Sequence, residues 1–401
     1  MKKKLLLLGG STQQVPAIKK ANELGYTTIV CDYLTDNPGQ EHAEKFYCIS
    51  TTDKEKVLEV AKKEAVDGIV AYASDPAAPT AAYVAEAMGL PTNPYKSVQI
   101  LSNKDLFRDF LKKNHFFTPR AKGFNSVKEF MATISTFNFP LVIKPVDSSG
   151  SKGVSIVHNK EKIKDVVNHA LSFSRTKRYI VEEYVEMEGY QVAGDGLVVN
   201  GKLVFRCFAN DHFNPFASNP FVPISASFPY NRSTEIHNKI HSEIQRLIDL
   251  LNLKSGAFNF DIRVDKEDNI FLMEVGPRNG GNFIPQVIKY ATGIDMIEST
   301  IKSSLGEDRD DIKMVEPKGF WSYYAIHSLK KGTLTEVKIN EKVKKENVVE
   351  EYYYYEKGEE IPLFTGANKV IGILILKFDS MNQMLSMMDY PENWLEVKVE
   401  E

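Results

Sequence analysis

The sequence predicts a chain of mixed α/β and α+β class, in which a parallel α/β domain precedes a mixed core and a small, mostly β C-terminal domain. Three observations predict this arrangement. Short apolar runs alternate with helical patterns over residues 4–98, which is typical of parallel βαβ units. Two hairpin patterns follow, over residues 191–210 and 256–275. After residue 306 the charge rises and strand-like segments dominate.

The N-terminal region is predicted to form three strands, each followed by a helix. The strands are "KLLLL", "YTTIVCDY" and "VDGIVAY", and the helices are "QVPAIKKANELG", "KEKVLEVAKKEA" and "APTAAYVAEAMG". Gly9, Gly10 and Ser11 follow the first strand, at the edge where an open α/β sheet usually binds its ligand. This loop lacks the G-x-G-x-x-G spacing, which argues against a dinucleotide.

A linker and a helix are expected next. The segment "LPTNPYKS" carries Pro91 and Pro94 and has the composition of a linker. Ser102 is expected to be the N-cap of the helix "KDLFRDFLKKN". Further helices are predicted near "EKIKDVVNHALSF" and over residues 235–252, where one face is apolar. That face consists of Ile236, Ile240, Ile244, Leu247, Ile248 and Leu251.

Composition excludes several classes of protein. The 401 residues suffice for two or three domains, and 43% hydrophobic and 26% charged residues are ordinary for a globular chain. A net charge of −3 gives no reason to expect nucleic acid or an anionic membrane as partner. The three cysteines fit neither a disulfide framework nor a zinc site. The apolar run Leu5 to Leu8 is too short for a signal peptide. We therefore expect a cytoplasmic protein.

The stretch "PLVIKPVDSSGSKGVSIV", residues 140–157, joins two strands through a loop rich in serine and glycine. It is not a P-loop, because that motif ends in Gly-Lys-Ser/Thr and opens a helix. Backbone N–H groups of such a loop can still form a nest for an anion, and Gly150 and Gly153 allow close approach of a ligand. The alternative is a surface hairpin with a flexible turn.

The second hairpin brings two carboxylates together. Its turn, Asp265 to Asn269, places Asp261 close to cross-strand register with Glu274. Opposed carboxylates repel across a hairpin unless a cation lies between them. Mg²⁺ suits this position, since it takes oxygen ligands and is usually shared with substrate phosphates. The alternative is that one carboxylate points to solvent.

Further cationic residues complete a candidate triphosphate site. Arg278 leaves the second hairpin in "EVGPRNGG", where its planar fork could bind a phosphate or carboxylate. Lys144 ends a strand and Lys104 lies forty residues before it. Two lysines, a nest and a divalent metal would neutralise a triphosphate. The extended segment "VEEYVE", residues 181–186, offers an acceptor and a donor to an adenine.

The order of these motifs resembles the ATP-grasp superfamily of carboxylate–amine ligases over essentially the whole chain. It runs from Lys104 through "PLVIKPVDSSGSKGVSIV", "IVEEYVEMEG" and "FDIRVD" to "EVGPRNGG". The segments "GGNFIPQVIKYATGID" and "KKGTLTEV" look most like the L-amino-acid (dipeptide) ligase branch, and phosphoribosylglycinamide synthetase is the next closest resemblance. The resemblance implies a pre-ATP-grasp domain over residues 1–98, an ATP-grasp domain over 99–305 with a mobile lid at about 120–186, and a C-terminal α+β domain over 306–401.

The resemblance also implies roles for particular residues. Lys104 and Lys144 would contact the ATP phosphates, and the loop formed by Ser148, Ser149, Gly150, Ser151, Lys152 and Gly153 would close over them. Glu182 would accept from the adenine amino group, while Glu183, Tyr184 and Val185 would give backbone contacts. Asp261 and Glu274 would hold magnesium, with Mn²⁺ as an alternative. Arg278 would stabilise the transferred phosphoryl group and, with Lys144, count as catalytic.

Two positions depart from the family pattern. Gln191 stands where many members place a ribose-binding glutamate, and it can still hydrogen-bond hydroxyl groups. Gly276 stands where many place a metal-binding asparagine, which leaves the number of metal ions open.

The implied reaction starts when a carboxylate attacks the γ-phosphate of ATP and gives an acyl phosphate and ADP. An amine then attacks the acyl carbon and phosphate leaves. The expected partners are thus small-molecule substrates, with a homodimer left open. One wall of the substrate pocket is expected in residues 210–230, which are rich in aromatics and prolines, with an ordered surface loop as the alternative. A bicarbonate-using carboxylase or carbamoyl-phosphate-type enzyme and a non-catalytic ATP-binding sensor remain competing interpretations.

Overall fold

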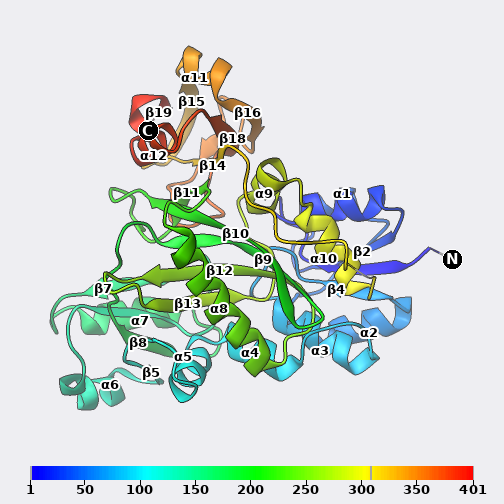
Figure 1. The fold of residues 1–401 in the computed structure, drawn as a ribbon, viewed down its shortest axis with the longest axis horizontal. Coiled ribbons are helices and arrows are strands. Elements are labelled where there is room, and N and C mark those ends of the chain that lie inside the picture. The colour runs from blue at the N-terminus through cyan, green and yellow to red at the C-terminus, as the bar shows by residue number, and fades with distance from the viewer. Residues whose placement is uncertain (1, 308, 401) are drawn as a thin grey trace.

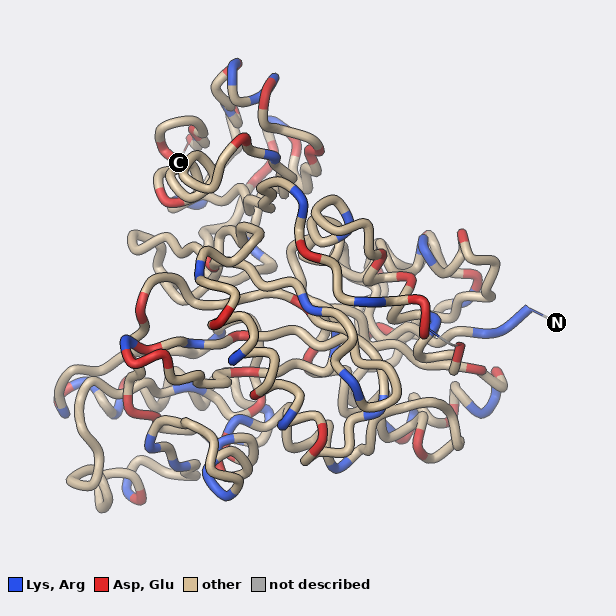
Figure 2. Tube along the Cα trace, in the orientation of Figure 1, with Lys and Arg blue, Asp and Glu red and all other residues tan. Residues whose placement is uncertain are grey.

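The computed structural model describes residues 2–307 and 309–400. Figure 1 shows the N-terminal elements on one side of the molecule, the elements of residues 120–186 on another and the C-terminal elements at a third end. Figure 2 shows Lys and Arg residues interspersed with Asp and Glu residues along the chain, in keeping with its small net charge. Within the described residues, no helix is both long and apolar enough to cross a membrane.

The N-terminal sheet is parallel, with strand order β3-β2-β1-β4. Its strands are β1 (Lys4–Leu8), β2 (Thr27–Asp32), β3 (Lys45–Cys48) and β4 (Gly68–Val70), and its helices are α1 (Val15–Glu23), α2 (Lys54–Glu64) and α3 (Ala78–Met88). The three predicted strands and three helices are confirmed. Sequence analysis missed β3, an edge strand with no buried residue, because its four residues lack an apolar pattern.

The expected linker and N-cap need correction. Residues of "LPTNPYKS" already begin helix α4 (Tyr95–Ser102), so Ser102 ends that helix. Asn103 occupies the N-cap position of the next helix, α5 (Lys104–Lys113). Its side chain makes no capping bond, since it donates to the Gln99 carbonyl at 2.8 Å. Pro91 and Pro94 made this helix hard to predict from the sequence. The helix starts directly after Pro94, and proline is tolerated at the start of a helix.

A four-stranded antiparallel sheet carries the lysine-containing loop. Its order is β5-β8-β6-β7, from β5 (Ala121–Phe124), β6 (Leu141–Pro145), β7 (Ser155–Val157) and β8 (Tyr179–Glu183). Helices α6 (Val127–Thr133) and α7 (Ile163–Phe173) cover it, with a 3-10 turn at Ile134–Thr136. Phe124, Phe130 and Tyr179 lie at the centre of its core. The loop of residues 146–154 therefore joins two paired strands, as predicted.

The central sheet has eight strands in the order β13-β12-β9-β10-β11-β14-β18-β16, all paired antiparallel. They are β9 (Val192–Val199), β10 (Lys202–Phe213), β11 (Pro223–Phe228), β12 (Gly256–Val264), β13 (Ile270–Gly276), β14 (Phe320–Ile326), β16 (Val348–Tyr353) and β18 (Gly372–Phe378). The predicted turn at Asn200 and Gly201 has positive φ at both residues, 50° and 76°, as a type I′ turn requires. Helix α8 (Thr234–Leu251) buries all six predicted apolar residues.

Three strands of this sheet come from beyond residue 306, so the sheet continues across the expected boundary at 305. That division of the chain stays a prediction. A smaller sheet, β17-β15-β19, lies at the C-terminal end. The remaining elements are β15 (Gly332–Ile339), β17 (Glu360–Ile361), β19 (Leu395–Glu400), α9 (Ile284–Thr292), α10 (Met296–Ser304), α11 (Glu341–Glu346), α12 (Met381–Asp389) and short 3-10 turns at Pro38–Glu41 and Pro391–Asn393. Helix α10 packs Ile297 and Ile301 into the core of the N-terminal sheet, which fixes that sheet beside β12.

Candidate active site

A cavity of about 570 Å³ opens between the N-terminal sheet, the β5-β8-β6-β7 sheet and the central sheet. Its size is typical of a small-molecule site. Every sequence-predicted site residue except Gly153 lines it. These residues are Lys104, Lys144, Ser148, Ser149, Gly150, Ser151, Lys152, Glu182, Glu183, Tyr184, Val185, Gln191, Asp261, Glu274 and Arg278. The fold thus brings together residues spread over 175 positions of sequence.

Lys144 and Glu182 form a buried ion pair at the floor of the cavity. They lie on the paired strands β6 and β8, and the Lys144 Nζ is 2.7 Å from the Glu182 carboxylate. The second oxygen of that carboxylate is 2.9 Å from Nε of Arg108, on α5. Glu182 is therefore already engaged by two cations. Its predicted contact with the adenine amino group stays a prediction.

Sequence analysis missed Arg108, which is 3% exposed inside an otherwise ordinary amphipathic helix. Its guanidinium also donates to the carbonyls of Leu272, at 3.2 Å, and Met273, at 2.8 Å. Arg108 thereby fixes α5 to β13 and to Glu182. A buried arginine is the residue type that holds such an ion pair in place, because its planar fork serves several acceptors at once.

The charges at this floor alter one another. Burial lowers the pKa of Lys144 to about 8, against the attraction of Glu182 and with the help of the Arg108 and Lys104 charges. Although burial opposes ionisation of Glu182, the Arg108 and Lys144 cations lower its pKa to about 2. The Glu182 carboxylate is stabilised by two cations, Arg108 and Lys144, whereas these two cations share a single negative charge. An anionic ligand beside Lys144 would supply the missing negative charge.

The loop after β6 lies against the segment that follows β10. The Ser151 hydroxyl donates to the Phe221 carbonyl at 2.7 Å, and the Asn219 side chain donates to the Ser151 carbonyl at 2.9 Å. The Lys104 ammonium donates to the Ser148 carbonyl at 3.0 Å. Two hydrogen bonds of Ser151 thus join the loop to the segment that follows β10.

Gly153 does not line the cavity. It has a φ of 74°, and a Cβ there would lie 2.9 Å from Cγ of Pro145 and 3.0 Å from Cδ2 of Phe173. The glycine is thus required where the loop packs against β6 and α7. Its predicted contact with phosphates gains no support from this placement.

Asp261 and Glu274 are direct partners in the β12–β13 register, with a bulge immediately after Asp261. The Lys104 ammonium is 2.9 Å from the Glu274 carboxylate, so a cation does lie at this pair. Burial and then the Glu274 charge raise the pKa of Asp261 to about 7. Although burial disfavours its charged form, Lys104 lowers the pKa of Glu274. Lys104 neutralises Glu274, whereas Asp261 makes no ion pair with any residue within 2–307 and 309–400.

This donor set fits a magnesium ion that substrate phosphates help to hold. The described residues contain no group of three or more His, Cys, Asp or Glu side chains placed to hold a metal by themselves. Two carboxylates are the usual protein contribution to Mg²⁺, with phosphate oxygens and water filling the other positions. The uncompensated Asp261 carboxylate is the observation that supports this fit.

Asp211 is a further carboxylate that lines the cavity, and sequence analysis missed it. It lies on β10, is 4% exposed and accepts a hydrogen bond from the Gln191 side chain at 3.1 Å. Burial and then the Asp261 charge raise its pKa well above the usual value. Asp211 falls inside the stretch 210–230 that was expected to form one wall. Phe213, Pro220, Phe221 and Pro223 of that stretch also line the cavity.

Arg263 holds Gln191 and the segment of residues 181–186. Its Nη1 donates to the Val185 carbonyl at 2.8 Å, its Nε donates to the Gln191 side chain at 3.4 Å, and its guanidinium lies 4.9 Å from the centre of the Tyr184 ring. Arg263 therefore fixes one edge of the cavity, next to the position where the resemblance places a ribose.

Arg278 is bound by the N-terminal domain. Its Nε and Nη2 donate to the two carboxylate oxygens of Asp75 at 2.7 and 2.6 Å, and its Nη1 donates to Asn259 at 2.7 Å. Burial opposes the charge of Arg278, but Asp75 raises its pKa above the usual value. Sequence analysis missed Asp75, although it follows β4 at the ligand-binding edge of the parallel sheet, where such a residue could have been sought.

The turn after Arg278 is anchored by another buried acid. Asp195, on β9, accepts from the Gly280 N–H at 2.9 Å and from the Asn259 side chain at 3.0 Å. Burial raises the pKa of Asp195 to about 6. The hydrogen bonds to Asp195 therefore fix the backbone of the glycine-rich turn, and with it the direction of the Arg278 side chain.

The opposite walls of the cavity come from both ends of the chain. Ser11, Gln13 and Gln14 contribute from the loop after β1. Tyr323, Ala367 and Asn368 contribute from the C-terminal part. The N–H of Asn282 donates to the Gln13 side chain at 2.8 Å, which joins the loop after β1 to the segment that follows β13.

Comparisons with known proteins agree with this geometry. A family model described as an ATP-grasp domain matches residues 137–286. A formate-dependent phosphoribosylglycinamide formyltransferase from Bacillus velezensis is 30% identical over 192 residues, which are 46% of this chain and 49% of that protein. This chain spans between 28% and 49% of the length of the first three curated relatives.

Two solved structures share the fold over the whole chain. An L-amino acid ligase from Bacillus licheniformis has a TM-score of 0.81 and 21% identity, covering 100% of this chain and 99% of the other. A phosphoribosylglycinamide synthetase from Anaerococcus prevotii has a TM-score of 0.77 and 22% identity, covering 100% of both chains. At such identities the likeness shows the fold, and the fold class predicted from the sequence is confirmed.

Proposed function

The chain carries an ATP-grasp domain, which confirms the resemblance found in its sequence, and from this premise we propose that the protein is an ATP- and Mg²⁺-dependent ligase. It would join a carboxylate to an amine through an acyl phosphate and release ADP and phosphate. The first acid–amine class to test is a pair of amino acids.

One observation carries this proposal. A single cavity collects the cations Lys104, Lys144 and Arg278 together with the carboxylate pair Asp261 and Glu274. A triphosphate with a magnesium ion needs both kinds of group within a few ångströms. A cavity for a neutral ligand would not need three cations beside two acids, because burying charged groups is costly. Of these acids, Glu274 is paired with Lys104.

The residues of this chain would act mainly by positioning, as in other phosphoryl transfers. Lys144 and the loop of residues 148–152 would bind the phosphates of ATP. Lys104 lies between that loop and Glu274, so it would contact both the phosphates and the metal-binding pair. Magnesium, held by Asp261 and Glu274, would offset negative charge on the phosphates.

Two further tasks fall to the loop and to Arg278. Closure of the loop would keep water from the acyl phosphate, which water would otherwise hydrolyse. Arg278 would offset the charge that develops on the transferred phosphoryl group and on the departing phosphate. The described residues need supply no covalent nucleophile for either step.

The amino-acid class is supported by the wall opposite the phosphates. Asp211 is acidic, and Gln13, Asn282 and Tyr323 are polar and uncharged. Such groups suit the ammonium group of an amino acid. The solved L-amino acid ligase structure shares this fold over the whole chain. The phosphoribosylglycinamide synthetase structure supports a purine ligase as the second candidate.

A phosphate-release screen tests the proposal. The full chain is incubated with ATP and Mg²⁺ and with pairs of amino acids, with small acids and amines, and with phosphoribosylamine plus glycine. Phosphate release that requires one acid and one amine, together with a condensed product in the mass spectrum, supports a ligase. Release stimulated by bicarbonate alone would favour the carboxylase or carbamoyl-phosphate interpretation. Nucleotide binding with no release from any mixture would favour a sensor.

Lys144→Ala provides the internal control for that screen. It removes a charge-assisted contact worth roughly 1.5–3 kcal/mol, so ATP binding measured by calorimetry should weaken at least about tenfold. Lys128 is an exposed residue on α6, which covers the same four-stranded sheet. The variant Lys128→Ala should bind ATP as the parent does. Equal affinities for the parent and Lys144→Ala would contradict the phosphate assignment.

A further inference from the structure

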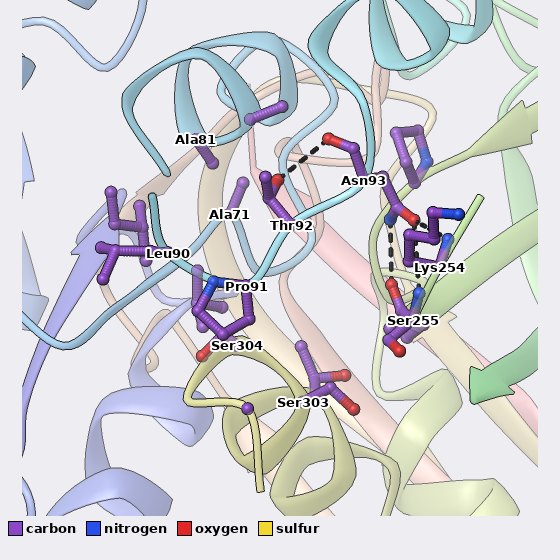
Figure 3. A pocket seen from close by; sticks show the side chains of 18 of the residues that line it. Ala71, Ala81, Leu90, Pro91, Thr92, Asn93, Lys254, Ser255, Ser303 and Ser304 are labelled. Carbon is purple, nitrogen blue, oxygen red and sulfur yellow. Dashed lines mark hydrogen bonds between the residues drawn. The ribbon is translucent and has the colours of Figure 1, made fainter. Parts of the chain in front are cut away.

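A second cavity of about 580 Å³ lies outside the active-site cavity. It is bounded by β4 and α3, by residues 89–93 before α4, by the turn of residues 254–257 and by the C-terminal end of α10. We call it the linker cavity. Figure 3 shows Ala71, Ala81 and Thr92 facing Ser303 and Ser304 across it, with Leu90 and Pro91 on one side and Lys254 and Ser255 on the other.

The linker cavity carries a net positive charge. Its charged lining residues are Lys254, Arg278, Arg309 and Glu307. Glu307 is already paired, since its carboxylate binds the Lys3 ammonium at 3.0 Å and accepts from the Tyr26 hydroxyl at 2.9 Å. Lys254 makes no ion pair with any residue in the described ranges 2–307 and 309–400. Arg278 and Arg309 have acidic partners of their own, Asp75 and Asp311, so Lys254 is the lining cation with which an anionic ligand could pair.

Arg309 supplies the most specific observation. Asp311 accepts from its Nε at 3.1 Å and from its Nη2 at 3.3 Å. Its Nη1 is buried and has no hydrogen-bond partner among the described residues. A buried donor without an acceptor is rare and costs free energy. An anionic ligand in the linker cavity would supply that acceptor.

The opposite wall is apolar. It is built from small side chains, Ala71 directly after β4 and Ala78, Ala81 and Ala82 of α3, together with Val98 of α4. Alanine methyl groups leave the volume that larger side chains would fill. A flat apolar group would lie against such a wall and exclude water from it.

We propose that the linker cavity binds a small organic anion with a flat apolar part, such as an aromatic carboxylate, and that this ligand is an effector of the active site. The anionic group lies toward Lys254 and Arg309, and the apolar part lies against the alanine wall. Binding at this cavity is independent of the proposed ligase activity, whereas the effector role uses the site described above.

The path to the active site is short. Pro277 and Arg278 line the linker cavity, and Arg278 lines the active-site cavity as well. Thr300 also lines the linker cavity, and its hydroxyl donates at 2.8 Å to Asn279, the residue after Arg278. A ligand in contact with Pro277 and Thr300 therefore acts on the turn that carries Arg278. Effector coupling requires such a shared element.

The binding test uses 1-anilinonaphthalene-8-sulfonate, an aromatic anion whose fluorescence rises in apolar surroundings. The full chain is first saturated with adenylyl-imidodiphosphate and Mg²⁺, so that the active-site cavity is blocked. No acid or amine substrate is present. The parent protein should bind one probe molecule per chain. Ala81→Leu, which fills the cavity, should weaken binding at least tenfold, and Lys254→Gln combined with Arg309→Gln should weaken it about as much.

Matched controls locate the probe. Ala87→Leu places the same side chain on an exposed position of α3, and Lys266→Gln removes an exposed lysine elsewhere. Both should bind the probe as the parent does. If Ala81→Leu and the Lys254→Gln, Arg309→Gln variant bind the probe as the parent does, the proposal is overturned. The charge variant keeps the test valid if Ala81→Leu fails to fold, because Lys254 is exposed.

Displacement and coupling complete the experiment. Sodium benzoate should displace the probe, and inorganic phosphate alone should do so much less. Displacement by phosphate but not by benzoate would overturn the role of the alanine wall. Benzoate should also change the affinity for adenylyl-imidodiphosphate at least about fivefold in the parent but not in Ala81→Leu. Probe binding without any such change would overturn the effector role while leaving the ligase proposal untouched.

Discussion

Asp75 and Arg278 form a two-pronged ion pair between the N-terminal sheet and the turn after β13, with N–O distances of 2.7 and 2.6 Å across 203 positions of sequence. Asn259 takes a third donor of the same guanidinium. The arginine that the resemblance assigns to the phosphoryl group is thus held by a residue that follows β4 of the N-terminal sheet. Its position depends on how the N-terminal sheet sits against the central sheet.

Asp75→Asn should lower the rate of ADP formation at least about tenfold, because a catalytic group displaced by as little as an ångström loses much of its effect. Affinity for an ATP analogue should change little, since Lys104 and Lys144 are untouched. Steady-state ADP release and calorimetry give the two values. Asp268→Asn, which breaks the surface pair with Arg232, should alter neither. A parent-like rate in Asp75→Asn would show that Arg278 needs no support from this carboxylate.

Affinity for ATP should depend on the ionisation of Lys144. A lysine is charged below its pKa, and burial lowers the pKa of Lys144 to about 8, so its charge is lost as pH rises through that value. Binding of an ATP analogue should weaken about tenfold between pH 7 and pH 9. In Lys144→Arg the guanidinium stays charged, and this loss should disappear. Calorimetry across the pH range decides the matter, and a parallel decline in both proteins would refute the assignment.

The loop of residues 147–154 should be more protected when a nucleotide is bound. Hydrogen bonds to Phe221 and Asn219 join Ser151 to the opposite segment, and phosphates would add contacts along the whole loop. Amide hydrogen exchange over this loop should slow after an ATP analogue and Mg²⁺ are added. Exchange in α7 should be unchanged, which provides the internal control. In Asn219→Ala, exchange without nucleotide should be faster than in the parent. Equal exchange with and without nucleotide would argue against a lid.

Asp261→Asn should raise the melting temperature of the metal-free protein at pH 8. Burial and Glu274 raise the pKa of Asp261 from 3.8 to about 7, so between those values the folded state binds more protons than the unfolded state. Stability contributed by this group therefore falls as pH rises through the same window. Asparagine carries no charge and so avoids this loss of stability, and the gain in melting temperature should therefore shrink toward pH 5.

The same variant should lose activity. ADP formation should fall at least about a hundredfold, because a charged ligand of the metal is gone. Melting curves in EDTA at pH 5 and pH 8, with ADP-release rates in saturating Mg²⁺, test both expectations. Glu274→Gln is the comparison, since it also removes the partner of Lys104 and should gain less stability. A lower melting temperature for Asp261→Asn at pH 8 would show that the carboxylate is structural.

Local patterns predicted most of the secondary structure. The apolar face of α8 and the Asn200-Gly201 turn are set by residues close in sequence, and both were found where expected. The register of Asp261 with Glu274 could be predicted because a short turn fixes which residues face each other. The start of α4 and the strand β3 were missed. Prolines obscured the first, and an exposed edge strand has no apolar pattern to reveal it.

The order of the elements, the lysine-containing loop, the opposed carboxylates and the resemblance that joins them could all be predicted from the amino-acid sequence. Tertiary structure alone decided which charges meet: Arg108 with Glu182, Lys104 with Glu274, Asp75 with Arg278, and Asp211 beside Asp261. Hydrogen-bonding patterns of helices and hairpins depend on neighbours a few positions away, so sequence periodicity carries them. The ion pair of Asp75 with Arg278, across 203 positions, depends on how the N-terminal and central sheets pack, and no local pattern records that packing.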